Sequence, residues 1–171
     1  MEPFALDERL ARDSSLVIKL GLCELRLIED RRWPWLVLVP QRPGISEVFE
    51  LTPLDQAVLT FEQNLVASGL KTLTHATKIN VAAIGNVVRQ LHVHVIARFE
   101  GDPNWPGPVW GHGAAEAYTD DERRAFYTTP TPPYDLGDLW VQGAGGDLMR
   151  CTTAKTAGGS YASGDWTKAV K

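Results

Sequence analysis

Two histidines separated by a single residue are the side chains in this sequence best placed to do chemistry together. His92 and His94 lie in the run Gln90–Ile96, where polar and apolar residues alternate. Alternation with a period of two predicts a half-buried strand, on which Gln90, His92 and His94 share one face with neighbours about 6.5–7 Å apart. Two adjacent imidazoles could form a nucleophile with its helper or bind one metal ion. They could also simply lie on the solvated face of an edge strand.

The sequence around this run resembles the histidine triad (HIT) family, whose signature is His-φ-His-φ-His-φ-φ, where φ is apolar. The resemblance covers roughly Phe4–Gly111 and includes the turn residues Gly85 and Asn86 ahead of the run. It is most similar to a bacterial branch that carries Gln-Leu-His-Val-His-Val followed by a Trp-Pro-rich segment, here Asp102–Trp110. Gln90 then stands where most of the family has the first histidine.

The resemblance implies a catalytic set of His92, His94 and Gln90. By its pattern, His92 attacks an α-phosphate, His94 hydrogen-bonds the phosphate being transferred, and Gln90 supports them. A glutamine can still donate and accept hydrogen bonds at that position. The side chains of Asn80 and Asn86 are candidate donors to the phosphate oxygens, because stabilisation of charge is usually the largest catalytic contribution.

A carboxylate near the ribose is also expected from the resemblance. Glu29 and Asp30 lie at the turn where family members place an acid or amide that contacts the ribose. Each could equally be a solvated turn residue.

The implied function is a nucleotide hydrolase or transferase acting on a nucleoside 5′-phosphoryl compound, such as a dinucleoside polyphosphate or a phosphoramidate. A neutral imidazole is a competent nucleophile near pH 7, and a nucleotidyl-histidine intermediate divides one hard displacement into two easier ones. One ring nitrogen of His92 must face phosphorus, while the other N–H is held by an acceptor. No cofactor is expected, although a divalent ion can accompany a polyphosphate substrate.

Two other functions fit parts of the pattern. Gln90 could mark a non-catalytic nucleotide sensor with a weakened triad. His92 and His94 could instead be zinc ligands of a hydrolase, with His75, His112 or Glu24 completing the set. The tryptophans Trp33, Trp35, Trp105 and Trp110 could wall or cover a nucleotide pocket, or pack a core.

Composition restricts the class of protein. The 171 residues carry a formal net charge of -4, so no basic surface for nucleic acid is expected. The only cysteines, Cys23 and Cys151, lie in dissimilar segments, which favours free thiols and a reducing cytoplasm. The sequence shows neither a signal peptide nor an apolar run long enough to cross a membrane, so a cytoplasmic protein without a membrane partner is predicted.

Periodicity predicts an α+β domain with a five-stranded, mostly antiparallel sheet, one long helix and short flanking helices. The expected strands are Ser15–Leu20, Cys23–Ile28, Trp35–Pro40, Leu73–Ile79 and Gln90–Arg98. The long helix should start at Thr52 and Pro53, an N-cap followed by proline, and end at Gly69. A shorter helix is expected at Leu6–Arg12. The family's members commonly dimerise, which implies a homodimer.

The C-terminal part of the chain has a different character. A capping box at Thr119–Glu122 predicts a short helix toward Tyr127. The segment 128–171 is rich in Pro, Gly, Ser and Thr, so it is predicted to be poorly ordered and separate from a HIT-like domain over residues 1–127.

Overall fold

The computed structural model describes residues 3–118, 125–126, 139–141, 148–156 and 160–168. Contacts divide the chain into two compact units, residues 1–117 and 118–171. This division falls earlier in the chain than the boundary after residue 127 that composition suggests. Each unit is described by itself below.

The first unit is built on a five-stranded antiparallel sheet, which confirms the predicted α+β fold. Its strand order is β1-β2-β3-β5-β4. The strands are β1 (Ser14–Lys19), β2 (Cys23–Ile28), β3 (Trp35–Pro40), β4 (Lys78–Ala82) and β5 (Val93–Arg98). Strand β5, which contains His94, is therefore an inner strand, and β4 lies at one edge.

A long helix, α2 (Pro53–Thr74), begins where the sequence predicts. The Thr52 hydroxyl accepts a hydrogen bond from the Asp55 N–H at 3.1 Å, and Pro53 occupies the first turn. The predicted end at Gly69 is wrong, because the helix continues to Thr74 and ends at His75, whose φ is 55°. Leu70 is buried in the core, and this packing outweighs the weak helix propensity of glycine. The next strand consequently starts at Lys78, later than predicted.

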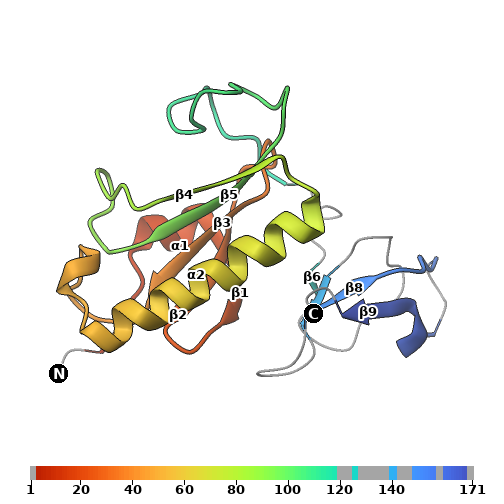
Figure 1. Cartoon of the computed structure of the whole chain (residues 1–171), viewed down its shortest axis with the longest axis horizontal. Helices are drawn as coiled ribbons and strands as arrows, with labels where there is room; N and C mark the ends of the chain where they lie inside the picture. The colour runs from red at the N-terminus through yellow and green to blue at the C-terminus, as the bar shows by residue number, and fades with distance from the viewer. Residues whose placement is uncertain (1–2, 119–124, 127–138, 142–147, 157–159, 169–171) are drawn as a thin grey trace. The chain divides into compact units, whose positions relative to one another are not determined.

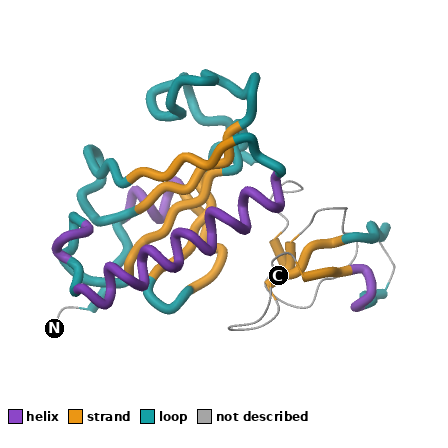
Figure 2. The backbone as a smooth tube through the Cα atoms, in the orientation of Figure 1, coloured by secondary structure: helices purple, strands orange, loops and turns teal. Residues whose placement is uncertain are grey.

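The two faces of the sheet have different neighbours. Helix α2 packs across one face, where Leu59, Val66 and Leu70 join the main core with strand residues such as Leu38 and Val95. The short helix α1 (Glu8–Asp13) lies on the other face (Figure 1). The tube view shows the same layers, with α2 running along the full length of the sheet (Figure 2). The side chains of His92 and His94 belong to the face opposite α2, since Val37 of β3 pairs with His94 and packs with Leu10 of α1.

The histidine strand is shorter than predicted. Strand β5 begins at Val93, and all six of its residues are buried. The preceding residues bend away to meet another segment, because the Leu91 N–H donates to the Ile45 carbonyl at 2.9 Å. A short 3-10 helix, η1 (Val48–Glu50), follows that segment. His94 is thus on the strand, whereas Gln90 and His92 lie just before it.

The second unit contains a four-stranded sheet in the order β6-β7-β8-β9. Its strands are β6 (Ala125–Phe126), β7 (Leu139–Val141), β8 (Leu148–Cys151) and β9 (Trp166–Lys168), with a 3-10 helix η2 (Ser163–Asp165) before the last. Cys151 and Trp166 are buried together against Met149 and Tyr161.

Two predictions concern this unit. The capping box at Thr119–Glu122 lies outside the described residues. The residues Ala125 and Phe126, predicted to be helical, pair with β7 as a strand instead. The described residues of 128–171 form the strands β7, β8 and β9, the 3-10 helix η2 and the segments beside them. The other residues of this predicted disordered segment lie outside the described part of the chain. No helix in the described ranges is long and apolar enough to cross a membrane.

Candidate active site

His92 is held by a main-chain acceptor. Its Nδ1 lies 2.7 Å from the carbonyl oxygen of Gln90, two residues earlier. A carbonyl can only accept, so this contact places the ring proton on Nδ1 and leaves the lone pair on Nε2. The side chain is buried, with 7% of its surface exposed. The local bend before β5 therefore presents the imidazole with Nε2 as the nitrogen that can attack when the ring is neutral.

His94 has the opposite tautomer. The indole Nε1–H of Trp35, on the neighbouring strand β3, donates to His94 Nδ1 at 3.0 Å. Because an indole N–H can only donate, His94 Nδ1 is unprotonated and the neutral ring carries its proton on Nε2. Burial, followed by the nearby His92, lowers the pKa of His94 to about 4. His94 is therefore a neutral hydrogen-bond donor at physiological pH.

The two imidazoles are in contact. Their ring centroids are 4.9 Å apart and their planes cross at 85°. One ring offers a nucleophilic lone pair and its neighbour offers an N–H, so the pair can attack an electrophile while donating to an anionic oxygen on it.

Aromatic side chains enclose His94. The Trp110 ring lies 5.5 Å from the His94 ring and 6.0 Å from the Trp35 ring, edge to face in both cases. The loop that carries Trp110 is anchored by Arg98, a fully buried residue at the end of β5. Its guanidinium makes two 2.8 Å bonds to Asp102 and one of 2.9 Å to the Gly107 carbonyl. Arg98 thus holds the loop whose Trp110 packs against the His94 ring, in addition to Trp35 and His92.

A polar cavity of about 480 Å³ opens beside His92. Gly85 adopts a φ of 64°, which turns the loop after β4 back toward the site. The cavity is lined by Ser46, Glu47, Ala83, Ile84, Gly85, Asn86, Arg89, Leu91 and His92. Asn86, a predicted phosphate donor, therefore shares a cavity with the predicted nucleophile, and Arg89 adds a cation that sequence reasoning did not select.

The other predicted phosphate and ribose contacts lie in different surroundings. Asn80 is on β4, and its Oδ1 accepts from the Arg98 guanidinium at 3.3 Å. Glu29 accepts a hydrogen bond from the Ser15 hydroxyl at 2.6 Å. Asp30 is buried and forms an ion pair with Arg32 at 2.6 Å. None of these three residues lines the cavity beside His92 among the described residues.

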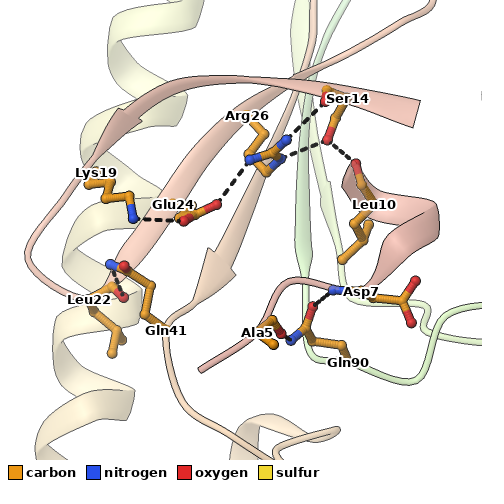
Figure 3. A network of polar contacts seen from close by, with 10 residues as sticks. All are labelled: Ala5, Asp7, Leu10, Ser14, Lys19, Leu22, Glu24, Arg26, Gln41 and Gln90. Atoms are coloured by element: carbon orange, nitrogen blue, oxygen red, sulfur yellow. Dashed lines mark hydrogen bonds and ion pairs between the residues drawn. The ribbon is translucent and has the colours of Figure 1, made fainter. Parts of the chain in front are cut away.

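The side chain of Gln90 faces the N-terminal segment. Its Oε1 accepts from the Asp7 N–H at 2.9 Å, and its Nε2 donates to the Ala5 carbonyl at 2.8 Å. Figure 3 shows the amide between these two main-chain groups. Gln90 and His92 therefore meet through the main-chain carbonyl of Gln90 rather than through its side chain.

The residues proposed to complete a zinc site are dispersed. Glu24 is buried in an ion pair with Arg26 at 2.9 Å and also meets Lys19 (Figure 3). His75 ends α2, and the His112 ring lies against Trp33. Within the described ranges, no three His, Cys, Asp or Glu side chains are grouped as metal ligands.

Sequence reasoning does not select three residues of the site as functional groups, namely Trp35, Arg89 and Arg98. Trp35 is predicted only as a stacking or core residue, and Arg98 only as the last residue of an expected strand. The strand pairing Trp35↔Ile96 places the indole diagonally beside His94. That pairing joins residues far apart in the chain, so periodicity within one strand could not indicate it.

Comparison with known proteins agrees with this architecture. A family model described as the HIT domain matches residues 9–101. A curated relative from Mycobacterium tuberculosis, named AP-4-A phosphorylase, is 28% identical over 138 residues, covering 74% of this chain and 69% of its own length.

Solved structures extend the comparison. A histidine triad protein from Sinorhizobium meliloti 1021 is 70% identical with a TM-score of 0.70, covering 71% of this chain and 90% of its own. Another from Marinobacter aquaeolei VT8 is 45% identical with a TM-score of 0.70, covering 71% of this chain and 88% of its own. A third, from Bradyrhizobium japonicum, is 42% identical with a TM-score of 0.68, covering 69% of this chain and 88% of its own.

Proposed function

This chain belongs to the HIT family, and we propose that it hydrolyses or transfers the nucleotidyl group of a nucleoside 5′-phosphoryl compound through a nucleotidyl-His92 intermediate. The observation that carries this proposal is the pair of opposite tautomers. The Gln90 carbonyl leaves His92 Nε2 free to attack, and the Trp35 indole leaves His94 Nε2 with a proton to donate.

The reaction proceeds in two displacements. His92 Nε2 attacks the α-phosphorus, and the leaving group departs with the electron pair of its bond to phosphorus. The nitrogen of a phosphoramidate also takes up a proton from solvent, so it leaves as the neutral amine. The proton stays on His92 Nδ1, which is hydrogen-bonded to the Gln90 carbonyl. The adduct is therefore a cationic phosphoimidazole, which is a good leaving group. Water then attacks phosphorus, the N–P bond breaks, one proton goes to solvent, and neutral His92 and a nucleoside monophosphate are released.

The other groups act on charge and position. His94 donates from Nε2 to a non-bridging oxygen of the transferred phosphate. Asn86 lines the cavity from which substrate reaches His92 and is proposed as a phosphate donor. We assign Asn80 an indirect role, because its side chain bonds the guanidinium that anchors the Trp110 loop.

The proposed substrates are dinucleoside polyphosphates or nucleoside phosphoramidates. The name of the mycobacterial relative supports the first class. Arg89 in the cavity also suits the anionic leaving group of a polyphosphate. The reaction on this proposal needs no cofactor, although a divalent ion can accompany a polyphosphate. Gln90 is proposed to take the position of the first triad histidine, with Glu29 and Asp30 as proposed ribose-side residues.

Trapping of the adduct is the decisive experiment. Wild-type protein mixed with diadenosine polyphosphate or an adenosine phosphoramidate and quenched without acid should gain the mass of one nucleotidyl group on His92. The variant His92→Asn should bind nucleoside monophosphate and form no adduct. Its activation barrier should rise by several kcal/mol, so turnover should fall at least about a thousandfold. The exposed His75→Asn variant is the matched control and should react as wild type does.

Other outcomes would point to other functions. Binding of a nucleoside monophosphate without an adduct from any activated nucleotide would identify a sensor. One tightly held zinc ion per chain, lost together with activity on treatment with a chelator, would identify a metal hydrolase. Turnover that persists in His92→Asn within about tenfold would refute the nucleophile assignment.

We also propose that the protein is a homodimer. Leu54, Phe61 and Leu65 recur at helical spacing along α2, and 73%, 69% and 43% of their surfaces are exposed. In the described part of the chain, β4 ends the sheet, and a two-fold axis would let this edge pair with that of a second copy. Sedimentation should show a dimer that Phe61→Glu converts to monomer, while Val87→Glu, at another exposed apolar position, does not.

A reducing compartment such as the cytoplasm is the proposed location. Cys23 and Cys151 are both buried, and they belong to different units of the chain. Their dissimilar sequence contexts favour a protein that does not meet an oxidising environment. Fractionation of cells producing the tagged protein would test this.

A further inference from the structure

Gln90 joins the N-terminal segment to the residue that orients His92. The side-chain amide bridges two main-chain groups of that segment, accepting from the Asp7 N–H and donating to the Ala5 carbonyl (Figure 3). The main-chain carbonyl of the same residue accepts from His92 Nδ1. One residue thus contacts the N-terminal segment on one side and the nucleophile on the other.

Further contacts tie the N-terminal segment to the loop before β5. The Arg9 guanidinium donates to the Val87 carbonyl at 3.0 Å. Phe4, Leu6 and Val88 of the same loop all pack against one buried cluster, which consists of Leu10, Val37 and Val39. The N-terminal segment is therefore docked on the loop that leads to His92 by apolar packing and three hydrogen bonds.

We propose that Gln90 is a positioning residue whose side chain clamps residues 5–7 and thereby fixes the main-chain carbonyl that selects the reactive tautomer of His92. The consequence for catalysis rests on the proposed function, whereas the effect on the His92 ring does not. On this view Gln90 suits the first position of the triad because its amide accepts and donates at once.

The chemistry of the side chain supports this assignment. An amide of this length supplies an acceptor for an N–H and a donor for a carbonyl in one rigid group. An ionised glutamate could still accept from Asp7 but would face the Ala5 carbonyl with no proton to give. An alanine would leave both main-chain groups without their partner. The Gln90 oxygen is already used by Asp7, which argues against a direct contact with substrate.

The test measures the His92 tautomer by nitrogen NMR of the ligand-free full-length protein, with kcat and KM as a second readout. In Gln90→Ala and Gln90→Glu, the Nδ1-protonated form should no longer dominate, and kcat should fall by about ten- to a hundredfold with little change in KM. His94 should keep its tautomer, since its partner is Trp35.

A matched pair at Asp7 removes one clamp bond without touching Gln90. Asp7 has a φ of -57°, which proline can adopt, so Asp7→Pro deletes the donating N–H. Asp7→Ala keeps that N–H and loses the same side-chain cap of α1. Asp7→Pro should shift the His92 tautomer as Gln90→Ala does, and Asp7→Ala should resemble wild type.

Two results would overturn the clamp. The first is a His92 ring that remains Nδ1-protonated in Gln90→Ala, whatever the turnover. The second is an Asp7→Pro protein whose ring behaves like that of Asp7→Ala. A wild-type protein without nucleotide turnover would refute the proposed function instead, and the NMR comparison would still decide the clamp.

Discussion

The proton on His94 is set by one indole. Trp35 donates to Nδ1, and an imidazolium could not accept that bond because both of its nitrogens carry hydrogen. Protonation of His94 would therefore cost a buried hydrogen bond in addition to desolvation. Burial, followed by the nearby His92, already lowers the pKa of His94 to about 4, so Nε2–H stays available as a donor across the physiological range.

Replacement of the indole should release this constraint. In Trp35→Phe, the His94 ring should populate both neutral tautomers, and kcat should fall by about three- to tenfold, the worth of one hydrogen bond. Nitrogen NMR of His94 and steady-state kinetics measure the two effects. Trp110→Phe is the control, because Trp110 Nε1 has no partner in the described part of the chain. A His94 ring with one fixed tautomer in Trp35→Phe would contradict the assignment.

At the scale of elements, a buried carboxylate joins α2 to the hairpin of β1 and β2. Glu62 accepts from the N–H groups of Leu22 and Cys23 at 2.7 and 3.0 Å. Both of those residues are fully buried. The helix therefore holds the hairpin of β1 and β2 through a polar contact as well as through the apolar core.

Loss of this buried carboxylate should destabilise the fold. Glu62→Ala leaves two buried N–H groups without an acceptor, so the free energy of unfolding should fall by about 2–4 kcal/mol. Asn64→Ala, an exposed change on the same helix, should have little effect. Urea denaturation followed by circular dichroism compares the two variants. Equal stabilities would show that water replaces Glu62 at the hairpin.

At the scale of the whole molecule, the buried His94 makes stability depend on pH. The pKa of His94 is about 4 when folded, against about 6.5 for an unfolded histidine. Between these values the unfolded chain binds a proton that the folded chain does not. The stability is thus complete above about pH 6.5 and is lost as pH falls toward 4.

Urea unfolding from pH 7.5 to 4 should show this dependence. The free energy of unfolding should fall by about 1.4 kcal/mol per pH unit, or roughly 3 kcal/mol in all, from this residue. His94→Gln should flatten the profile in that window, and His75→Asn should not. Burial raises the pKa of Asp102, but its bonds with Arg98 and the Phe99 N–H lower that pKa overall. The contribution of such carboxylates to stability is therefore lost only at still lower pH. An unchanged slope in His94→Gln would refute the shift.

Local patterns in the sequence determined the elements and the reactive pair. The period of two around His94 predicts a half-buried strand, and Thr52 followed by Pro53 predicts the start of α2, because both signals act between residues a few positions apart. The structure shows that this strand is an inner one and buried throughout. The same signals misplaced the end of α2, where packing of Leu70 outweighs Gly69, and the start of β5, where Leu91 bonds Ile45.

Which ring nitrogen of His92 and of His94 carries the proton depends on contacts that only the folded chain makes. His94 and Trp35 are 59 residues apart, and Gln90 reaches Asp7 across 83 residues. These partners meet only because the register of β3 against β5 and the docking of the N-terminal segment bring them together. A sequence pattern records which side chains share a face of one strand. Which nitrogen of His94 keeps its proton depends on a donor that folding delivers from elsewhere in the chain, and the nearby carbonyl that His92 meets belongs to a residue whose side chain is held by a distant segment.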